Sequence, residues 1–144
     1  MSAEENKATD YRFVAEVLTA HNLEVLPELV HEDFVELNPV PGQGPGREGL
    51  RDFLKVFFEA FPDLAWTPQD AVAEGDKVAA WWTWEGTHQG EFFGVPPSGR
   101  RVKVEAWTFD YFRDGKMAQS RILMDTMGLM QQLGAVPPAV GSSD

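Results

Sequence analysis

The sequence predicts an α+β domain in which helices pack on one face of a curved antiparallel sheet. Apolar residues recur at helical spacing through residue 61, whereas from residue 64 onward they follow strand patterns separated by turn signals. Helices that precede a run of strands are typical of this class. The chain has 144 residues, of which 43% are hydrophobic, so it has the length of one domain and enough apolar side chains for a core.

Helices are expected in the first part of the chain. Residues 9–20 present an apolar face behind a Thr-Asp capping pair, and residues 23–30 predict a shorter helix. Residues 47–61 have the clearest helical pattern, because their Leu and Phe side chains line one face before Pro62 ends the helix.

A short strand and a loop are expected between the second and third helices. Residues 34–38 predict the strand, which Pro39 ends. Residues 39–46 read PVPGQGPG, the densest Pro and Gly run in the chain, and they offer few backbone donors and no periodicity. This loop is a candidate for a mobile flap.

The rest of the chain predicts a meander of long strands. We expect these strands over residues 64–73, 77–86, 102–113 and 116–125. An Asp-Gly turn joins the last two, and a long connection over residues 88–100 joins the middle pair. A short helix should follow over residues 127–133. We expect one domain over residues 1–138 and a disordered tail over residues 139–144.

The predicted strands carry apolar side chains in both alternating phases. In residues 102–113, Ala106 and Phe112 fall in one phase, whereas Trp107, Phe109 and Tyr111 fall in the other. Helices can cover one face of such a sheet. The other face needs a second subunit, because an exposed apolar patch of this size is unusual for a monomer. We therefore expect a homodimer.

Composition excludes several classes of function. Lys and Arg number 12 against 23 Asp and Glu, so the net charge of −11 repels nucleic acid and anionic membranes. The absence of Cys excludes disulfides and thiol chemistry, and no apolar run approaches the ~20 residues of a membrane span. We expect a soluble cytoplasmic protein.

Motifs for metals, nucleotides and serine nucleophiles are missing as well. The three His residues show no metal-ligand spacing, and neither a G-x-G-x-x-G motif nor a P-loop is present. Ser98 lies in a PPSG segment rather than in a nucleophile elbow. The sequence therefore predicts no bound metal and no cofactor.

Four segments together resemble one protein family. Residues 86–100 read GTHQGEFFGVPPSGR, residues 60–64 read AFPDL, residues 114–116 read DGK, and residues 125–134 read DTMGLMQQLG. This combination is similar to the SnoaL-like polyketide cyclases of the NTF2-like superfamily, over about residues 9 to 138.

The resemblance implies a cone of curved antiparallel sheet packed on N-terminal helices, with a deep hydrophobic pocket and a homodimer or homotetramer. It also implies a cofactor-independent intramolecular aldol condensation on a polyketide ester, with one carboxylate as acid and base. That carboxylate maps onto Asp125. Where many relatives have Glu-His-Trp this chain has Gln119-Ser120-Arg121, and Leu37 replaces a His, so its pocket is lined differently.

Asp125, Arg121 and His88 are the predicted catalytic residues. Asp125 has apolar neighbours in sequence, where desolvation would favour a general base, although Asp at this position could also cap the last helix. Arg121 could hold an enolate or form an interface salt bridge. His88 could polarise a carbonyl or relay a proton, or could be a structural residue.

Six residues are the predicted substrate contacts: Asn38, Trp107, Tyr111, Phe109, Trp82 and Phe57. By resemblance, Asn38 would contact a ligand carbonyl, although it could also simply end its strand. The Tyr111 hydroxyl could stabilise an oxyanion, and the aromatic rings could form pocket wall.

The sequence leaves several functions open. The first is an enzyme that acts by acid/base catalysis on a small hydrophobic carbonyl compound, as a polyketide ester cyclase does. The alternatives are epoxide hydrolysis or isomerase chemistry in the same pocket, and a non-catalytic small-molecule binding protein. Fold alone does not separate them.

Overall fold

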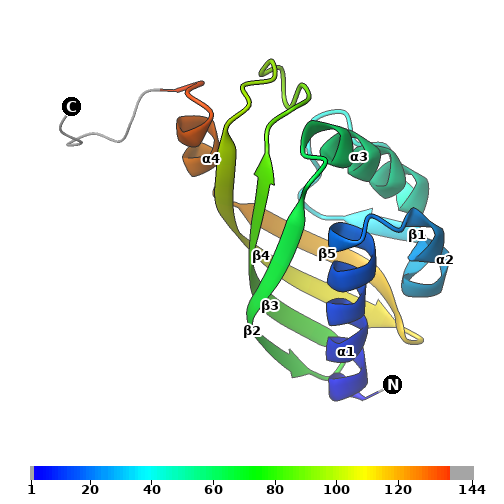
Figure 1. Cartoon of the computed structure of the whole chain (residues 1–144). Helices are drawn as coiled ribbons and strands as arrows, with labels where there is room; N and C mark the ends of the chain where they lie inside the picture. Colours follow the sequence, from blue (N-terminus) through cyan, green and yellow to red (C-terminus); the bar gives the residue numbers. More distant parts are fainter. Residues whose placement is uncertain (1, 137–144) are drawn as a thin grey trace.

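The computed structural model describes residues 2–136, which form one curved five-stranded sheet with helices on its concave side (Figure 1). The strands are β1 (Val30–Glu36), β2 (Ala65–Glu74), β3 (Lys77–Thr87), β4 (Arg101–Arg113) and β5 (Lys116–Met124). Their order across the sheet is β1-β5-β4-β3-β2. The predicted α+β class is confirmed. The disordered tail expected over residues 139–144 lies outside the described residues.

The first strand joins the sheet differently from the others. Strands β2 to β5 form the predicted antiparallel meander, whereas β1 lies parallel to β5. Strand β1 also begins at Val30, four residues earlier than expected, where residues 23–30 predicted helix. The sequence of a short strand does not specify its partner, so the mixed sheet could not be predicted.

The N-terminal helix begins earlier than expected. Helix α1 spans Ala3–Phe13 and starts with a capping box: the Glu5 N–H donates to Ser2 Oγ at 3.1 Å, and the Ser2 N–H donates to Glu5 Oε1 at 2.9 Å. It continues directly into η1 (Val14–Thr19), which has π-helical geometry. A short 3₁₀ turn, η2 (Leu23–Val25), and helix α2 (Leu26–Leu29) lead to β1.

Two further helices complete the fold. Helix α3 (Gly46–Ala60) lies with α1 on the concave side of the sheet, and helix α4 (Thr126–Gln132) follows β5 (Figure 1). None of the helices within residues 2–136 is long and apolar enough to cross a membrane.

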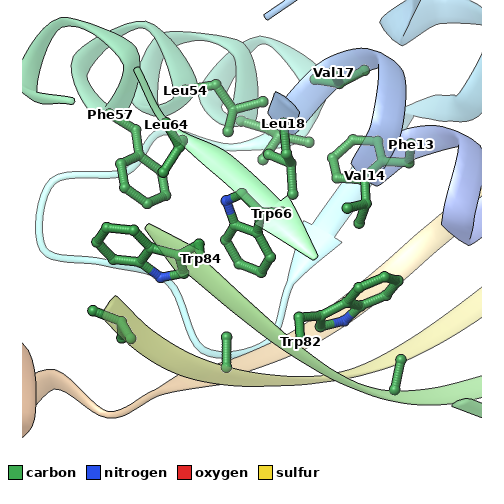
Figure 2. Packing of buried hydrophobic residues seen from close by; sticks show 14 of the residues in the cluster. Phe13, Val14, Val17, Leu18, Leu54, Phe57, Leu64, Trp66, Trp82 and Trp84 are labelled. Carbon is green, nitrogen blue, oxygen red and sulfur yellow. The ribbon is translucent and has the colours of Figure 1, made fainter. Parts of the chain in front are cut away.

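The core lies between the concave face of the sheet and the helices (Figure 2). Strand β3 directs Trp82 and Trp84 inward, where Trp84 packs edge-on against Phe57 of α3 at 5.0 Å between ring centroids. Phe61 and Phe92 complete this aromatic cluster, and both are fully buried. Such packing of large rings supplies much of the hydrophobic stabilisation of the domain.

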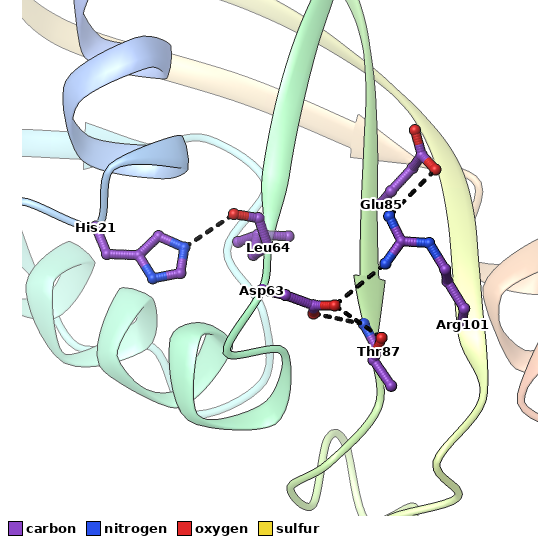
Figure 3. A network of polar contacts seen from close by, with 6 residues as sticks. All are labelled: His21, Asp63, Leu64, Glu85, Thr87 and Arg101. Carbon is purple, nitrogen blue, oxygen red and sulfur yellow. Dashed lines mark hydrogen bonds and ion pairs between the residues drawn. The ribbon is translucent and has the colours of Figure 1, made fainter.

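Polar contacts fix the end of the sheet near residues 88–100 (Figure 3). Asp63, in the turn after α3, accepts hydrogen bonds from the Thr87 N–H and hydroxyl, both at 2.7 Å. Arg101, at the start of β4, pairs with Asp63 at 3.1 Å and with Glu85 at 3.5 Å. These contacts tie the end of α3 to the two strands that flank the long loop.

Glycines fix the second half of the Pro/Gly loop. A Cβ atom on Gly49 of α3 would overlap the Gly44 carbonyl. Gly46 has a φ of +72°, and a Cβ there would lie 2.9 Å from the Glu32 carbonyl oxygen. The loop is therefore held against α3 and β1 at this end, and the expected flap motion stays a prediction.

We predict that Gly49→Ala destabilises the protein by about 1–3 kcal/mol, because the added methyl group must push the loop away from α3. Urea unfolding measures this change. Lys55→Ala, at an exposed position on the same helix, is the control and should change stability by no more than about 0.5 kcal/mol. Equal stability of the two variants would show that the loop is not held by this contact.

Candidate active site

A pocket lies between the concave face of the sheet and the helices. It has about 700 Å³ of empty volume, part of it open to solvent. Aromatic side chains form much of its wall: Phe13, Phe34, Phe53, Phe57, Trp66 and Trp82. Two of the predicted substrate contacts, Phe57 and Trp82, therefore line this pocket. The Trp82 indole N–H donates to Thr108 Oγ1 at 2.8 Å, which fixes the ring against β4.

Two carboxyl groups from opposite layers are buried in this pocket. Asp10 of α1 and Asp110 of β4 both line it, and their exposed fractions are 1% and 2%. The described residues supply no donor to Asp10 Oδ2 or to Asp110 Oδ1. The two side chains interact, and two buried carboxylates in contact are not readily ionised together, so burial favours a proton on one of them.

The environment sets the protonation of this pair. Burial raises the pKa of Asp10 well above its ordinary value, and the charge of Asp110 raises it further. Burial also raises the pKa of Asp110, while hydrogen bonds with the Asp10 and Ser120 side chains partly offset that rise. The pair therefore holds a proton more readily than two exposed carboxyl groups would.

A row of polar side chains extends from this pair across the sheet. Asp110 of β4 pairs in register with Ser120 of β5, and Ser120 pairs in register with Glu36 of β1. All three line the pocket, and neighbours across a sheet lie about 5 Å apart. The row leads from the buried pair to the half-buried Glu36.

Glu36 is held by backbone groups. Its Oε2 accepts from the Asn38 N–H at 2.9 Å and from the Ile122 N–H at 3.2 Å. Burial raises the pKa of Glu36, and these two hydrogen bonds oppose the rise. With Asp10 and Asp110, Glu36 completes the set of charged residues that line the pocket, all of them acidic.

Asp125 lies outside this pocket. Its carboxylate is exposed, and it caps α4 by accepting the Gly128 N–H at 2.9 Å. The expected desolvation of Asp125 is therefore wrong. Apolar neighbours in sequence misled the prediction, because the strand ends at Met124 and the next residue turns toward solvent. The structure instead shows the alternative role, in which Asp125 caps α4.

Four other predicted site residues lie on the outer, convex face of the sheet. Trp107, Phe109 and Tyr111 belong to the outward phase of β4, and Arg121 of β5 lies beside Phe109 in the strand register. Trp107, Phe109 and Arg121 line a shallow hollow of this outer face. The inward phase of β4 holds Thr108 and Asp110 instead. None of these four residues can contact a molecule bound in the pocket.

The two remaining candidates have structural contacts. His88 is fully buried beside Phe61 but does not line the pocket, and its Nδ1 accepts from the Ser98 N–H at 3.2 Å. Burial lowers the pKa of His88, which favours the neutral ring. Asn38 lies at the pocket mouth, where its amide donates to the Ile122 carbonyl oxygen at 2.7 Å.

The sequence contains a signal for the carboxyl pair that the prediction missed. Asp110 is the single charged residue in the otherwise uncharged inward phase of residues 102–113. The sequence favours a helix cap for Asp10, and the earlier helix start places it about two turns inside α1 instead. Glu36 was not among the predicted site residues. Among residues 2–136, no three His, Cys, Asp or Glu side chains converge as metal ligands.

Comparison with known proteins gives one family and several similar structures. A family model for SnoaL-like polyketide cyclases matches residues 8–133. TsrD from Streptomyces laurentii is 31% identical with a TM-score of 0.86, and the match covers 94% of this chain and 99% of TsrD. No curated protein matches the chain significantly.

Two further similar structures come from the same genus. IdmH from Streptomyces antibioticus, a proposed polyketide cyclase, is 31% identical with a TM-score of 0.78; the match covers 90% of this chain and 98% of IdmH. AclR from Streptomyces galilaeus, a proposed hydroxylase, is 29% identical with a TM-score of 0.82; the match covers 97% of this chain and 87% of AclR.

We predict that Asp110→Asn stabilises the protein increasingly as pH rises. A carboxyl group with a raised pKa in the folded state binds more protons folded than unfolded, so its contribution to stability falls as pH rises from about 4 through the folded pKa. Denaturant unfolding from pH 4 to 7 measures the difference in stability between variant and wild type, which should grow steadily in favour of the variant toward neutrality.

Asp125→Asn is the control for this experiment, because Asp125 is exposed and Asn caps a helix about as well as Asp. The pH dependence of its stability should match that of the wild type. If Asp110→Asn instead lost stability relative to the wild type as pH rises, the pKa of Asp110 would be lowered rather than raised by folding, and the expected retention of a proton by the pair would be refuted.

Proposed function

The chain belongs to the SnoaL-like polyketide cyclase family, and we propose that it is a cofactor-independent enzyme acting by acid/base catalysis on a small hydrophobic carbonyl compound. The proposed reaction is ring closure by intramolecular aldol condensation of a polyketide ester. The observation that carries the proposal is the buried pair Asp10 and Asp110, which lines an otherwise largely apolar pocket.

The pair has the composition that an aldol step needs. Asp110, as the carboxylate, takes a proton from the carbon next to one carbonyl group, and the resulting enolate attacks a second carbonyl carbon to form the C–C bond. Asp10, as the carboxylic acid, gives its proton to the oxygen of that second carbonyl. The pair again holds one proton at the end, so the reaction is an isomerisation that needs no oxidant or cofactor.

Neighbouring groups bear on this assignment. The Trp66 ring is part of the pocket wall, and its buried indole N–H has no acceptor among the described residues, so it could serve a substrate oxygen only if the ring turned toward the pocket. The Ser120 hydroxyl, which hydrogen-bonds Asp110, orients the base.

The other functions fit this pocket less well. Epoxide hydrolysis by a carboxylate, an Arg and an Asn would need the Arg side chain in the pocket, and Arg121 lies on the outer face. Isomerase chemistry would use the same pair and differs only in the substrate. A binding protein would need no buried acid, and the cost of burying two carboxyl groups favours a catalytic role.

We predict that Asp110→Asn lowers turnover by ~10²–10⁴-fold while substrate binding changes little, because Asn keeps the shape but cannot accept a proton. Steady-state kinetics on a panel of aromatic polyketide esters measures this, with small epoxides as the second panel. Asp125→Asn is the matched control and should keep wild-type turnover, whereas Asp125→Ala should cost ~1 kcal/mol of stability as a lost cap.

Normal turnover by a folded Asp110→Asn variant would remove the pair from the mechanism. If Asp125→Asn lost turnover and Asp110→Asn did not, Asp125 would be the acid/base residue, as the family resemblance implies. If the wild-type protein bound compounds of the panel but converted none of them, the result would favour a non-catalytic binding protein.

We also propose that a second copy of the chain covers the outer face of the sheet. Trp107 and Leu123 are 46% and 57% exposed there, and Trp81 stacks on Trp107 at 6.3 Å between ring centroids. An exposed apolar patch of this kind is typical of an interface. A cytoplasmic location and independence of metals and cofactors stay predictions from the sequence.

We predict a homodimer in solution, and light scattering at micromolar concentration measures its mass. Leu123→Glu should shift the particle toward the 16.1 kDa of one chain, because a carboxylate would be buried in the interface. Lys55→Glu, on the opposite side of the molecule, should leave the mass unchanged. A wild-type particle of 16.1 kDa would refute the dimer.

A further inference from the structure

An apolar hollow lies at the mouth of the pocket, with about 1120 Å³ of empty volume that includes open solvent. We call it the mouth groove. Its walls are the loop after β1, the exposed Phe93 of the 88–100 loop, the end of β5 and Met130 of α4. Val40, Ile122 and Met124 line both the mouth groove and the pocket, so the two spaces adjoin at these side chains.

The two spaces differ in polarity. No charged residue lines the mouth groove, and its polar side chains are Asn38 and Thr126. The Asn38 amide is already engaged with the Ile122 carbonyl oxygen. Of the residues that line the two spaces, the acidic ones, Asp10, Glu36 and Asp110, all line the inner pocket. A molecule that fits both spaces therefore has a polar, reacting end inside and an uncharged apolar end outside.

Phe93 is held in an unusual position. It is 41% exposed and has a φ of +49°, in the left-handed region that a bulky residue rarely adopts. The buried Phe92 anchors it, with ring centroids 4.3 Å apart, and a tight turn to Val95 closes through hydrogen bonds of 3.1 and 2.9 Å. Core packing does not explain an exposed ring held under strain, whereas contact with a ligand does.

The walls of the mouth groove are fixed to the rest of the fold. The N–H groups of Gln89 and Gly90 both donate to the Ala60 carbonyl oxygen, at 2.8 and 3.2 Å, so the long loop is docked on the end of α3. Gln132 of α4 bonds both backbone groups of Lys103, at 2.8 and 2.9 Å. A preformed groove costs little ordering free energy when it binds a ligand.

We propose that the mouth groove binds the apolar tail of an elongated substrate whose carbonyl end reaches the inner pocket. This inference rests on the proposed function, which it deepens by assigning the substrate class: a neutral molecule with a carbonyl group at one end and a ring or chain of hydrocarbon at the other. Phe93 and Met130 are the specificity-determining residues for the length of that tail.

The test uses 2-naphthyl ketones with unbranched alkyl chains, which are neutral, carry one carbonyl group and need no turnover. Quenching of tryptophan fluorescence measures their dissociation constants, since Trp66 and Trp82 line the pocket. For the wild type, affinity should rise about twofold for each added methylene, which is about half the gain expected for a fully buried methylene.

Phe93→Ser and Met130→Ser should flatten this dependence on chain length and leave the affinity of the shortest ketone unchanged. Met127→Ser is the matched control, because Met127 lies on the same helix as Met130, is 62% exposed and does not line the mouth groove. It should show the wild-type dependence. The proposal would be overturned if ketone affinity still rose with chain length in Phe93→Ser and Met130→Ser as it does in the wild type.

Two other results would also overturn it. If Phe93→Ser weakened all ketones equally, Phe93 would act through the shape of the inner pocket. If it changed the mass of the particle in light scattering, the mouth groove would be a contact between copies of the chain. The proposed function is tested separately. If Asp110→Asn kept normal turnover, the proposed function would fail, but the dependence of ketone binding on chain length would be unaffected.

Discussion

The packing of α3 against β3 through aromatic rings is the interaction on which the other parts of this protein depend. Phe57 of α3 and Phe61, directly after the helix, contact Trp84 edge-on, and Phe92 from the long loop packs against both phenylalanines. One cluster therefore holds the helix on the sheet and anchors the loop at the mouth. Because α3 is fixed there and α1 crosses elsewhere, the concave face is not fully covered, and the pocket is what remains.

The chemistry of the pocket depends on the exclusion of water by the packed helices and sheet. Water cannot fully solvate Asp10 and Asp110, so the charged form of each carboxyl group is disfavoured and a proton stays with the pair. Burying these carboxyl groups lowers the free energy of unfolding, and packing of the apolar pocket walls must offset that loss. In the proposed function, the same desolvation that weakens the fold at this point keeps one carboxyl group protonated, so that the pair can donate and accept a proton.

The sheet separates its two faces by the alternation of its strands. Along β4 the inward side chains reach the pocket, and the outward ones, including Trp107 and Phe109, form an exposed apolar surface. A shift of one residue would exchange the two sets. The register of β4 with its neighbours therefore decides which aromatic residues can contact a substrate and which can contact a second copy of the chain.

The sequence by itself determined the class of the fold, the third helix, the long strands with their turns and the family, because periodicity, glycines and prolines are local properties. It also located the apolar residues Phe57 and Trp82. Only the tertiary structure decided that β1 runs parallel to β5, that Asp125 is an exposed cap, and that Asp10 meets Asp110. Burial and pairing of a carboxyl group depend on residues distant in the chain, and neighbours in sequence do not report them.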